Sequence, residues 1–266
     1  MDYKRTVGNV EMVSLIDGQG SGRPTEVFPA SSEDVWRNEY AELLDEEGLI
    51  HTRYGSLALR SDGKVVIVDT GDGPPDGTLI DDMARKGVER EAVDLVVLTH
   101  LHGDHVGWNL TDGRPTFPNA RYLVPRDDWQ YWTRPEVLRD ADRVRDQVVP
   151  LEGLAVMDLI ESEHRITSEL TALPTPGHTP GHISIAVSSA GQHAFILGDV
   201  AHSPAQAQHT DWSPVFDVDG DLAAATRHAV FDQLESEGLL ISSGHFPEQG
   251  FGRLARSGGR RYWQVA

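Results

Sequence analysis

A six-residue stretch carries four side chains of the kinds that bind metal ions. They are His100, His102, Asp104 and His105, and they directly follow the apolar residues 94–99. In extended backbone, side chains two residues apart point to the same side, so His100 and His102 can share one ion. Asp104 and His105 come after a bend at Gly103 and can turn toward a second ion. We therefore interpret this stretch as a metal-binding loop and not as a solvated polar loop.

The flanking sequence predicts the elements that position this loop. Residues 94–99 are typical of a buried strand, and ligand sites in layered α/β folds lie at the C-terminal ends of strands. Further strands are expected at residues 10–16, 52–58, 64–68, 121–124, 183–187, 194–197 and 239–242. Helices are expected at about 31–44, 78–87 and 222–234, the first two opened by capping boxes of Ser31 with Asp34 and Thr78 with Asp81. No linker-like stretch divides the chain, which predicts one domain over residues 1–266.

The motif and three later loops resemble the metallo-β-lactamase-fold hydrolases, whose signature is HxHxDH followed by three further ligands. The matching loops are 176–182, 197–199 and 243–246, and the likeness spans roughly residues 50 to 250. By this resemblance His100, His102 and His178 hold one metal, Asp104, His105 and His245 hold the other, and Asp199 bridges them. The resemblance also implies an α/β (α+β) fold in which two β-sheets pack face to face with helices outside, a four-layer αβ/βα sandwich.

Composition limits the classes of function. The chain has 266 residues, no cysteine and a net charge of −19. Without cysteine there are no disulfides, thiolate ligands or thiol nucleophiles, so a metal must be held by nitrogen and oxygen atoms. The negative charge argues against nucleic acid and anionic membranes as partners. The N-terminal residues have no apolar signal segment, and no run approaches the roughly 18 apolar residues of a membrane span, so we expect a cytoplasmic protein.

The ligand set predicts the chemistry. Two divalent ions that share a water lower its pKa from about 15.7 toward 7, which supplies a metal-bridging hydroxide as nucleophile at neutral pH. Imidazole and carboxylate ligands suit Zn²⁺ best, although Mn²⁺, Fe²⁺ and Co²⁺ also fit. Asp104 is the predicted catalytic residue, because a carboxylate there can orient the hydroxide and pass a proton to the leaving group.

Other residues near the motifs are candidates for supporting roles. Trp108, His202 and Phe246 adjoin the predicted ligands and are candidate substrate contacts, with an exposed loop position as the alternative for His202. The helix at 31–44 either packs on the core or belongs to a lid at about 20–50 that contacts substrate. His182 is expected to be a hydrogen-bonded supporting or core group, and Asp69 a supporting or turn residue.

The resemblance narrows the substrate to a small molecule. An aspartate at the bridging position argues against a true β-lactamase, and the short segment after His245 argues against a glyoxalase II-type thioesterase. What remains is the branch of acyl-homoserine-lactone lactonases and methyl-parathion-hydrolase-like enzymes, acting on a lactone or carboxylic ester. Organophosphate (phosphotriester) or thioester hydrolysis is the alternative activity. A non-catalytic metal-binding scaffold is a remote alternative. A homodimer is compatible with this branch of the family. No tyrosine occurs between residues 133 and 261, where lactonases usually place one in the pocket.

Overall fold

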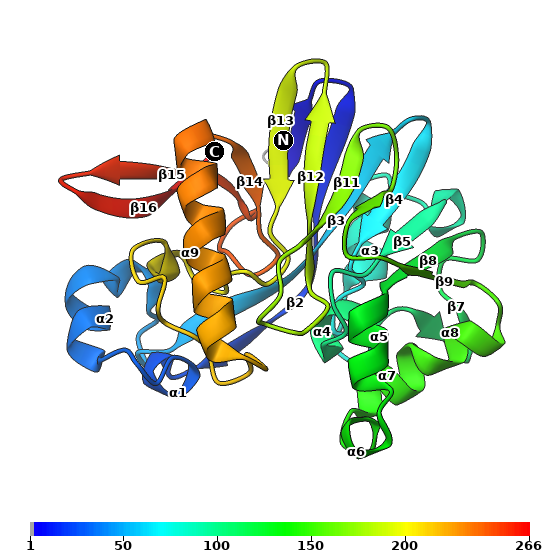
Figure 1. Cartoon of the computed structure of the whole chain (residues 1–266), viewed down its shortest axis with the longest axis horizontal. Coiled ribbons are helices and arrows are strands. Elements are labelled where there is room, and N and C mark those ends of the chain that lie inside the picture. Colours follow the sequence, from blue (N-terminus) through cyan, green and yellow to red (C-terminus); the bar gives the residue numbers. More distant parts are fainter. Residues whose placement is uncertain (1–2) are drawn as a thin grey trace.

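Two seven-stranded sheets make up the centre of the molecule in the computed structural model, which describes residues 3–266 (Figure 1). The first sheet has the order β1 (Lys4–Val7), β2 (Val10–Gly22), β3 (Ile50–Ser61), β4 (Lys64–Val68), β5 (Leu95–Val97), β8 (Arg121–Pro125) and β9 (Met157–Ile160). The second has the order β10 (His164–Arg165), β11 (Leu170–Pro174), β12 (Ile183–Ser189), β13 (Gln192–Ile196), β14 (Leu240–Ser242), β15 (Phe251–Ser257) and β16 (Arg260–Val265). A short hairpin joins β6 (Leu110–Thr111) to β7 (Arg114–Pro115).

The two sheets pack face to face through alternating apolar side chains. Leu57 and Leu59 of β3 point inward from the first sheet, and Ile183, Ile185 and Val187 of β12 point inward from the second. Alternate residues of a strand share one face, so each strand contributes every second side chain to this layer. Burial of this layer holds the two halves of the chain together.

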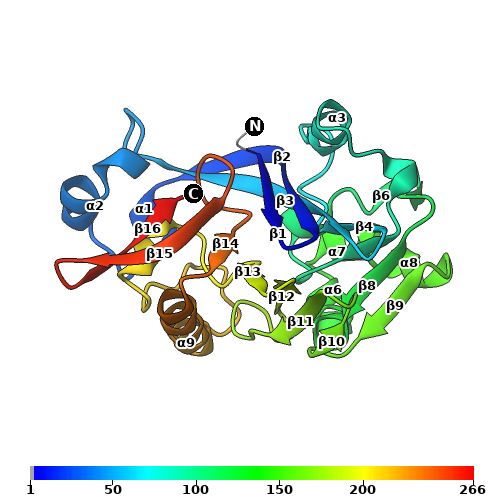
Figure 2. The same cartoon turned by 90° about the horizontal axis from the view of Figure 1, so that it is seen from above.

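Helices cover the outer face of each sheet (Figures 1 and 2). On the first sheet lie α3 (Leu79–Arg85), α5 (Arg126–Trp132), α6 (Pro135–Leu138), α7 (Asp142–Gln147) and α8 (Val149–Gly153), with 3₁₀ turn η2 (Arg90–Ala92) before β5. On the second lies α9 (Gly220–Glu237), which packs Phe231 and Leu234 against Phe195 and Ile241. The predicted four-layer αβ/βα sandwich is confirmed.

Parallel strands bring several loops to one edge. β4, β5, β8 and β9 are parallel neighbours, and so are β13 and β14. The C-terminal ends of parallel neighbours point the same way, so the loops that follow them gather at that edge.

The segment between β2 and β3 forms a separate small layer. It contains α1 (Pro24–Val27), α2 (Glu33–Glu39) and 3₁₀ turn η1 (Ala41–Leu43), and it is blue in Figure 1. Phe28 and Trp36 are buried against Trp212, with ring centroids 6.4 and 5.4 Å from it. This layer covers the loop after β13, which holds η3 (Pro204–Ala207).

Two predicted helix starts differ from the structure. The helix expected at 31–44 is α2, only seven residues long, and Ser32 caps it by accepting from Val35 N. The neighbouring Ser31 instead accepts from Trp36 Nε1. Thr78 makes no side-chain cap on α3; Asp17 of β2 reaches across and accepts from Leu79 N at 2.7 Å. A carboxylate from a distant strand therefore replaces the local capping box.

Two further features concern the ends of elements. Gly238 ends α9 with φ +61°, as its position in the sequence predicts. The hairpin β15–β16 was not expected from the sequence. Among residues 3–266, no helix combines the length and the apolar character that crossing a membrane requires.

Candidate metal centre

The predicted ligands come from four segments of chain at the shared sheet edge. His100 and His102 follow β5, and Asp104 and His105 lie on the short helix α4 (Gly103–Val106). His178 lies between β11 and β12, Asp199 follows β13, and His245 follows β14. Each of these side chains thus lies close after the end of a strand, and the strand fixes the position of its backbone.

The structure brings these seven side chains into contacting groups. Ligand atoms of His100, His102 and His178 lie within 4.8 Å of one another, and so do those of Asp104, His105 and His245. Asp199 stands between the two groups. Its Oδ2 lies 2.9 Å from His245 Nε2 and 3.3 Å from both His105 Nε2 and His178 Nε2. This is the division into two groups with one shared carboxylate that the resemblance implies.

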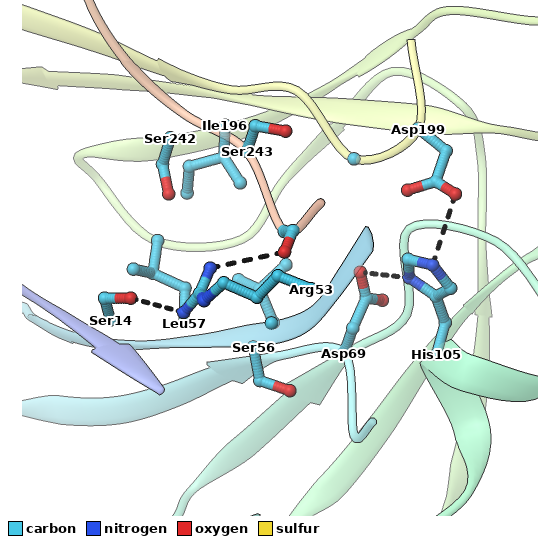
Figure 3. A pocket seen from close by; sticks show the side chains of 14 residues that line it. Ser14, Arg53, Ser56, Leu57, Asp69, His105, Ile196, Asp199, Ser242 and Ser243 are labelled. Carbon is cyan, nitrogen blue, oxygen red and sulfur yellow. Dashed lines mark hydrogen bonds and ion pairs between the residues drawn. The ribbon is translucent and has the colours of Figure 1, made fainter. Parts of the chain in front are cut away.

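The ring nitrogens turned away from the centre are held by hydrogen bonds. The Nδ1 atoms of His105, His178 and His245 lie 2.8, 2.8 and 2.7 Å from Asp69 Oδ2, Asp217 Oδ1 and the Arg53 carbonyl oxygen. Figure 3 shows His105 between Asp69 and Asp199. Fixing one ring nitrogen in this way leaves Nε2 aimed at the centre and makes it a better ligand.

The donor set fits divalent cations. His105 Nε2 and Asp199 Oδ1 are buried, and neither has a hydrogen-bond partner within residues 3–266. Buried polar atoms are normally paired, so unpaired atoms that converge with other nitrogen and oxygen donors fit a metal ligand set. Four imidazoles or carboxylates around each position, without thiolate, match the preferences of zinc and of other first-row divalent ions.

Burial and the charges of neighbouring side chains determine the protonation states of the candidate ligands. Burial lowers the pKa of His100 and of His102 well below the usual 6.5, which keeps both rings neutral, as ligands must be. Burial alone would raise the pKa of Asp199, but the histidines around it, His105 first, hold that pKa well below its usual value. Asp199 is therefore a carboxylate.

A cavity of about 460 Å³ opens over the two groups. Asp104, whose side chain is 25% exposed, and Asp199 line its floor together with His102, His178 and His245. The walls come from Gly20–Gly22, Val27, Thr52, Tyr54, Asp72, Gly103, His202 and Phe216. The cavity thus joins the candidate ligands to a wall that is partly apolar.

His202 lies in this cavity wall and not on an exposed loop. It is 5% exposed, and its Nε2 lies 3.0 Å from Asp199 Oδ2. Its ring stands edge-on to Phe216, with centroids 4.9 Å apart. The alternative of a solvent-exposed position for His202 is wrong.

Trp108 and Phe246, expected as substrate contacts, lie outside the cavity. Trp108 follows α4, and its side chain lies toward β2, where its Nε1 donates to Asp17 Oδ1 at 2.8 Å. A half-buried indole N–H needs such an acceptor. Phe246 is fully buried and packs edge-on against Trp263, with centroids 4.8 Å apart. The chain bends at residues 244–247, and this bend places His245 toward the centre and Phe246 in the core beside α9.

His182 and Asp69 support the ligand loops, as the sequence analysis expects. His182 Nε2 accepts from Asp199 N at 2.8 Å, and its Nδ1 lies 2.9 Å from Thr175 Oγ1. Asp69 accepts from Thr99 N and Thr99 Oγ1 in addition to its contact with His105. Both residues thus fix the backbone next to a predicted ligand.

Several residues at the centre were missed from sequence. Asp128 is fully buried and accepts from Leu101 N at 2.9 Å and Gly181 N at 2.7 Å, which ties the first two ligand loops together. Burial raises the pKa of Asp128 to about 6. Asp17, Asp217 and Phe216 were also missed. Each stands far from the motifs in sequence and carries no local signal, so only the fold reveals it.

Tyr54 supplies a pocket tyrosine from an unexpected place. It lies on β3, lines the cavity, and stands edge-on to His245 with ring centroids 6.5 Å apart. Burial, with the charges of Asp104 and Asp72, raises its pKa. The cavity wall therefore contains a tyrosine contributed by the first sheet.

Comparison with known proteins agrees with this architecture. The model of the metallo-beta-lactamase superfamily matches residues 56–245, which include all seven predicted ligands. The chain belongs to the metallo-beta-lactamase superfamily. An N-acyl homoserine lactonase of Bacillus thuringiensis is 24% identical over 171 residues, 64% of this chain and 63% of the lactonase. The N-acyl homoserine lactonase AttM of Rhizobium radiobacter is 32% identical over 123 residues, 44% of each chain.

Solved structures share the superfamily fold over almost the whole chain. The hydrolase AbOPH of the beta-lactamase superfamily has a TM-score of 0.90 at 24% identity, covering 99% of this chain and 97% of its own. The dizinc quorum-quenching lactonase AidC has a TM-score of 0.87 at 21% identity, covering 100% and 99%. The sequence match to the Bacillus thuringiensis lactonase spans less than two thirds of that protein's length. The likenesses to these solved structures show the fold.

Proposed function

We propose that this chain is a metal-dependent hydrolase that holds two zinc ions and opens a lactone or cleaves a carboxylic ester. The observation that carries the proposal is the pair of ligand groups that share Asp199 beneath a 460 Å³ cavity. When bound, two divalent ions lower the pKa of a water and polarise the carbonyl oxygen of the substrate. His100, His102 and His178 would hold one ion, Asp104, His105 and His245 the other, and Asp199 both.

Residues of the cavity would perform the remaining tasks. Asp104 is the predicted ligand with a partly exposed carboxylate, so it can accept a proton from the attacking water and deliver it to the departing alkoxide. His202 lines the cavity and can hold Asp199 in place, because its Nε2 lies 3.0 Å from Asp199 Oδ2. Val27 and Phe216 offer apolar contact to an acyl group. The acyl C–O bond breaks, and a carboxylate, a hydroxyl and one proton result.

A lactone is favoured by the cavity together with the matched proteins. Homoserine lactones carry a small polar ring on an apolar acyl chain, and the cavity has polar groups on its floor and the apolar side chains Val27 and Phe216 in its walls. Relatives that the chain matches are named N-acyl homoserine lactonases. Phosphotriesters and thioesters remain the alternative substrates on the same site, and a non-catalytic scaffold is disfavoured by the full ligand set.

Acid release in a pH-stat tests this proposal. We expect zinc-loaded protein to release one proton for each acyl-homoserine lactone opened, for short and long acyl chains, and Asp104→Asn to lower turnover about 10²- to 10⁴-fold. Asp158→Asn, on the edge strand β9, is the matched control and should leave turnover unchanged. Equal turnover in Asp104→Asn and the parent would contradict the mechanism. If zinc-loaded protein opens no lactone but cleaves aryl esters or phosphotriesters, the proposed substrate is wrong and one of those classes takes its place.

A further inference from the structure

A buried arginine lies behind the centre, on the side of His245. Arg53 of β3 is 7% exposed, and its guanidinium lies between the two sheets (Figure 3). Its Nη2 donates to Ser14 Oγ at 2.6 Å and to Leu15 O at 2.5 Å, both on β2. Its Nη1 donates to Gly244 O at 3.2 Å. One guanidinium therefore connects the first sheet to the loop that carries His245.

The backbone of the same residue contacts His245 directly. The Arg53 carbonyl oxygen lies 2.7 Å from His245 Nδ1, and His245 Nε2 lies 2.9 Å from Asp199 Oδ2. Side chain and main chain of Arg53 thus act on neighbouring residues of one loop. Together they fix both the position of the loop and the rotation of its imidazole.

Glycines make room for the guanidinium. A Cβ at Gly55 would lie 2.3 Å from Arg53 Nη1 and 2.6 Å from Gly244 O. A Cβ at Gly250, where φ is +69°, would lie 3.0 Å from the same Nη1. A side chain at Gly55 would push the guanidinium off Gly244, whereas one at Gly250 would clash first with Ser243 O, 2.1 Å away. The connection therefore depends on local sequence as well as on Arg53.

The stability of the fold does not explain why a guanidinium is buried at this position. The acceptors of the guanidinium are neutral, and burial lowers the pKa of Arg53 to about 10, opposed by the charge of Asp82. Burying a charge in this way costs free energy that an apolar side chain would avoid. Arg53 Nε has no partner within residues 3–266 and lines a cavity of about 20 Å³, which has room for one water.

We propose that Arg53 is a positioning residue for the metal ion held by Asp104, His105 and His245. The inference rests on the proposed metal centre, and it goes beyond it by assigning a function to a residue outside the ligand set. Arg53 acts through the His245 loop, whereas the group of His100, His102 and His178 has its own support in Asp217. Loss of Arg53 is therefore expected to weaken one of two metal sites.

The test compares metal binding in matched variants. Arg53→Met keeps the length of the stem and removes the charge, and Arg53→Lys keeps the charge but cannot reach Ser14 and Gly244 together. Arg261→Met is the control, because Arg261 is also 7% exposed but pairs with Asp232 and Glu235 on α9. Zinc affinity is measured by chelator competition, and the Co²⁺-substituted proteins are compared by absorption spectroscopy.

We expect Arg53→Met to weaken one of two zinc sites about 10- to 100-fold and to change the Co²⁺ spectrum, with a smaller loss in Arg53→Lys. Arg261→Met should keep both affinities and the parent spectrum. The inference would be overturned if Arg53→Lys and Arg53→Met bound zinc at both sites as tightly as the parent protein does. An equal loss of zinc affinity at both sites would also overturn it. Should Arg53→Met fail to fold, the Arg53→Lys result decides. No substrate is used, so absence of lactone hydrolysis would defeat the proposed function and leave this result intact.

Discussion

Support for the candidate ligands differs from one imidazole to the next. His105 and His178 are backed by the carboxylates of Asp69 and Asp217, whereas His245 is backed by a carbonyl oxygen. A carboxylate raises the basicity of an imidazole more than a carbonyl does. We infer that each proposed zinc ion has at least one strongly supported histidine.

His202 gives the sharpest prediction at the scale of a single residue. Replacing it by alanine should lower kcat for a lactone about 10- to 100-fold, because Asp199 loses the imidazole that holds its carboxylate beside the cavity. Zinc content should stay at the parent value, since His202 is outside the proposed ligand set. Steady-state kinetics and metal analysis check both expectations.

His228→Ala provides the matched control for His202. His228 lies on α9, and its side chain is 64% exposed. The control should keep both kcat and zinc content. Loss of zinc in His202→Ala would contradict the prediction and would make His202 a ligand, and an unchanged kcat would remove it from the mechanism.

The sequence singled out the candidate ligands, which the structure brings together, because they cluster within short motifs. Four of them stand between residues 100 and 105, and the local backbone alone places them side by side. Asp128 and Asp217 support the same loops but are isolated in the sequence. Their roles depend on hydrogen bonds across the fold, to Gly181 N and to His178, and no local pattern encodes such contacts.

At the scale of elements, strand order explains why distant loops meet. β4 and β5 are parallel neighbours in one sheet and β13 and β14 in the other, so Asp69, His100, Asp199 and His245 all follow strands that end at the same edge. Alternation and apolar runs predicted eight strands, namely β2, β3, β4, β5, β8, β12, β13 and β14, but not β1, β9, β10 or β11. The hairpin β15–β16 was missed because its burial depends on packing against α9 and on the ion pairs of Arg256 and Arg261 with Glu235.

The segment of α1 and α2 supports one wall of the cavity. Trp36 stacks with Phe28 at 5.9 Å, next to Val27 in the cavity wall. Trp36→Ala should reduce the free energy of unfolding by about 3–5 kcal/mol and raise KM for long-chain lactones, because the wall loses its support. Denaturant unfolding and kinetics measure the two effects.

Phe231→Ala separates these two effects. Phe231 is fully buried in α9 against the second sheet and away from the cavity wall. Its loss should cost a similar free energy of unfolding and leave KM unchanged. A KM that rises equally in both variants, or in neither, would contradict a lid function for residues 20–50.

The candidate metal centre lies where the two sheets of the molecule meet. The two ligand groups draw on both sheets: His100, His102, Asp104 and His105 come from the first, and His178, Asp199 and His245 from the second. The site therefore depends on the packing between the sheets. The net charge of −19 favours substrates that are neutral, as lactones are, over strongly anionic ones. A homodimer and a cytoplasmic location stay predictions.

Titration of metal-free protein with Zn²⁺, following bound metal and lactone hydrolysis together, tests directly whether the chain is a two-zinc hydrolase. We predict that hydrolysis rises until two equivalents are bound, since both ligand groups and the shared Asp199 take part. Binding that saturates at one equivalent, or hydrolysis that is independent of Zn²⁺, would contradict a two-zinc hydrolase.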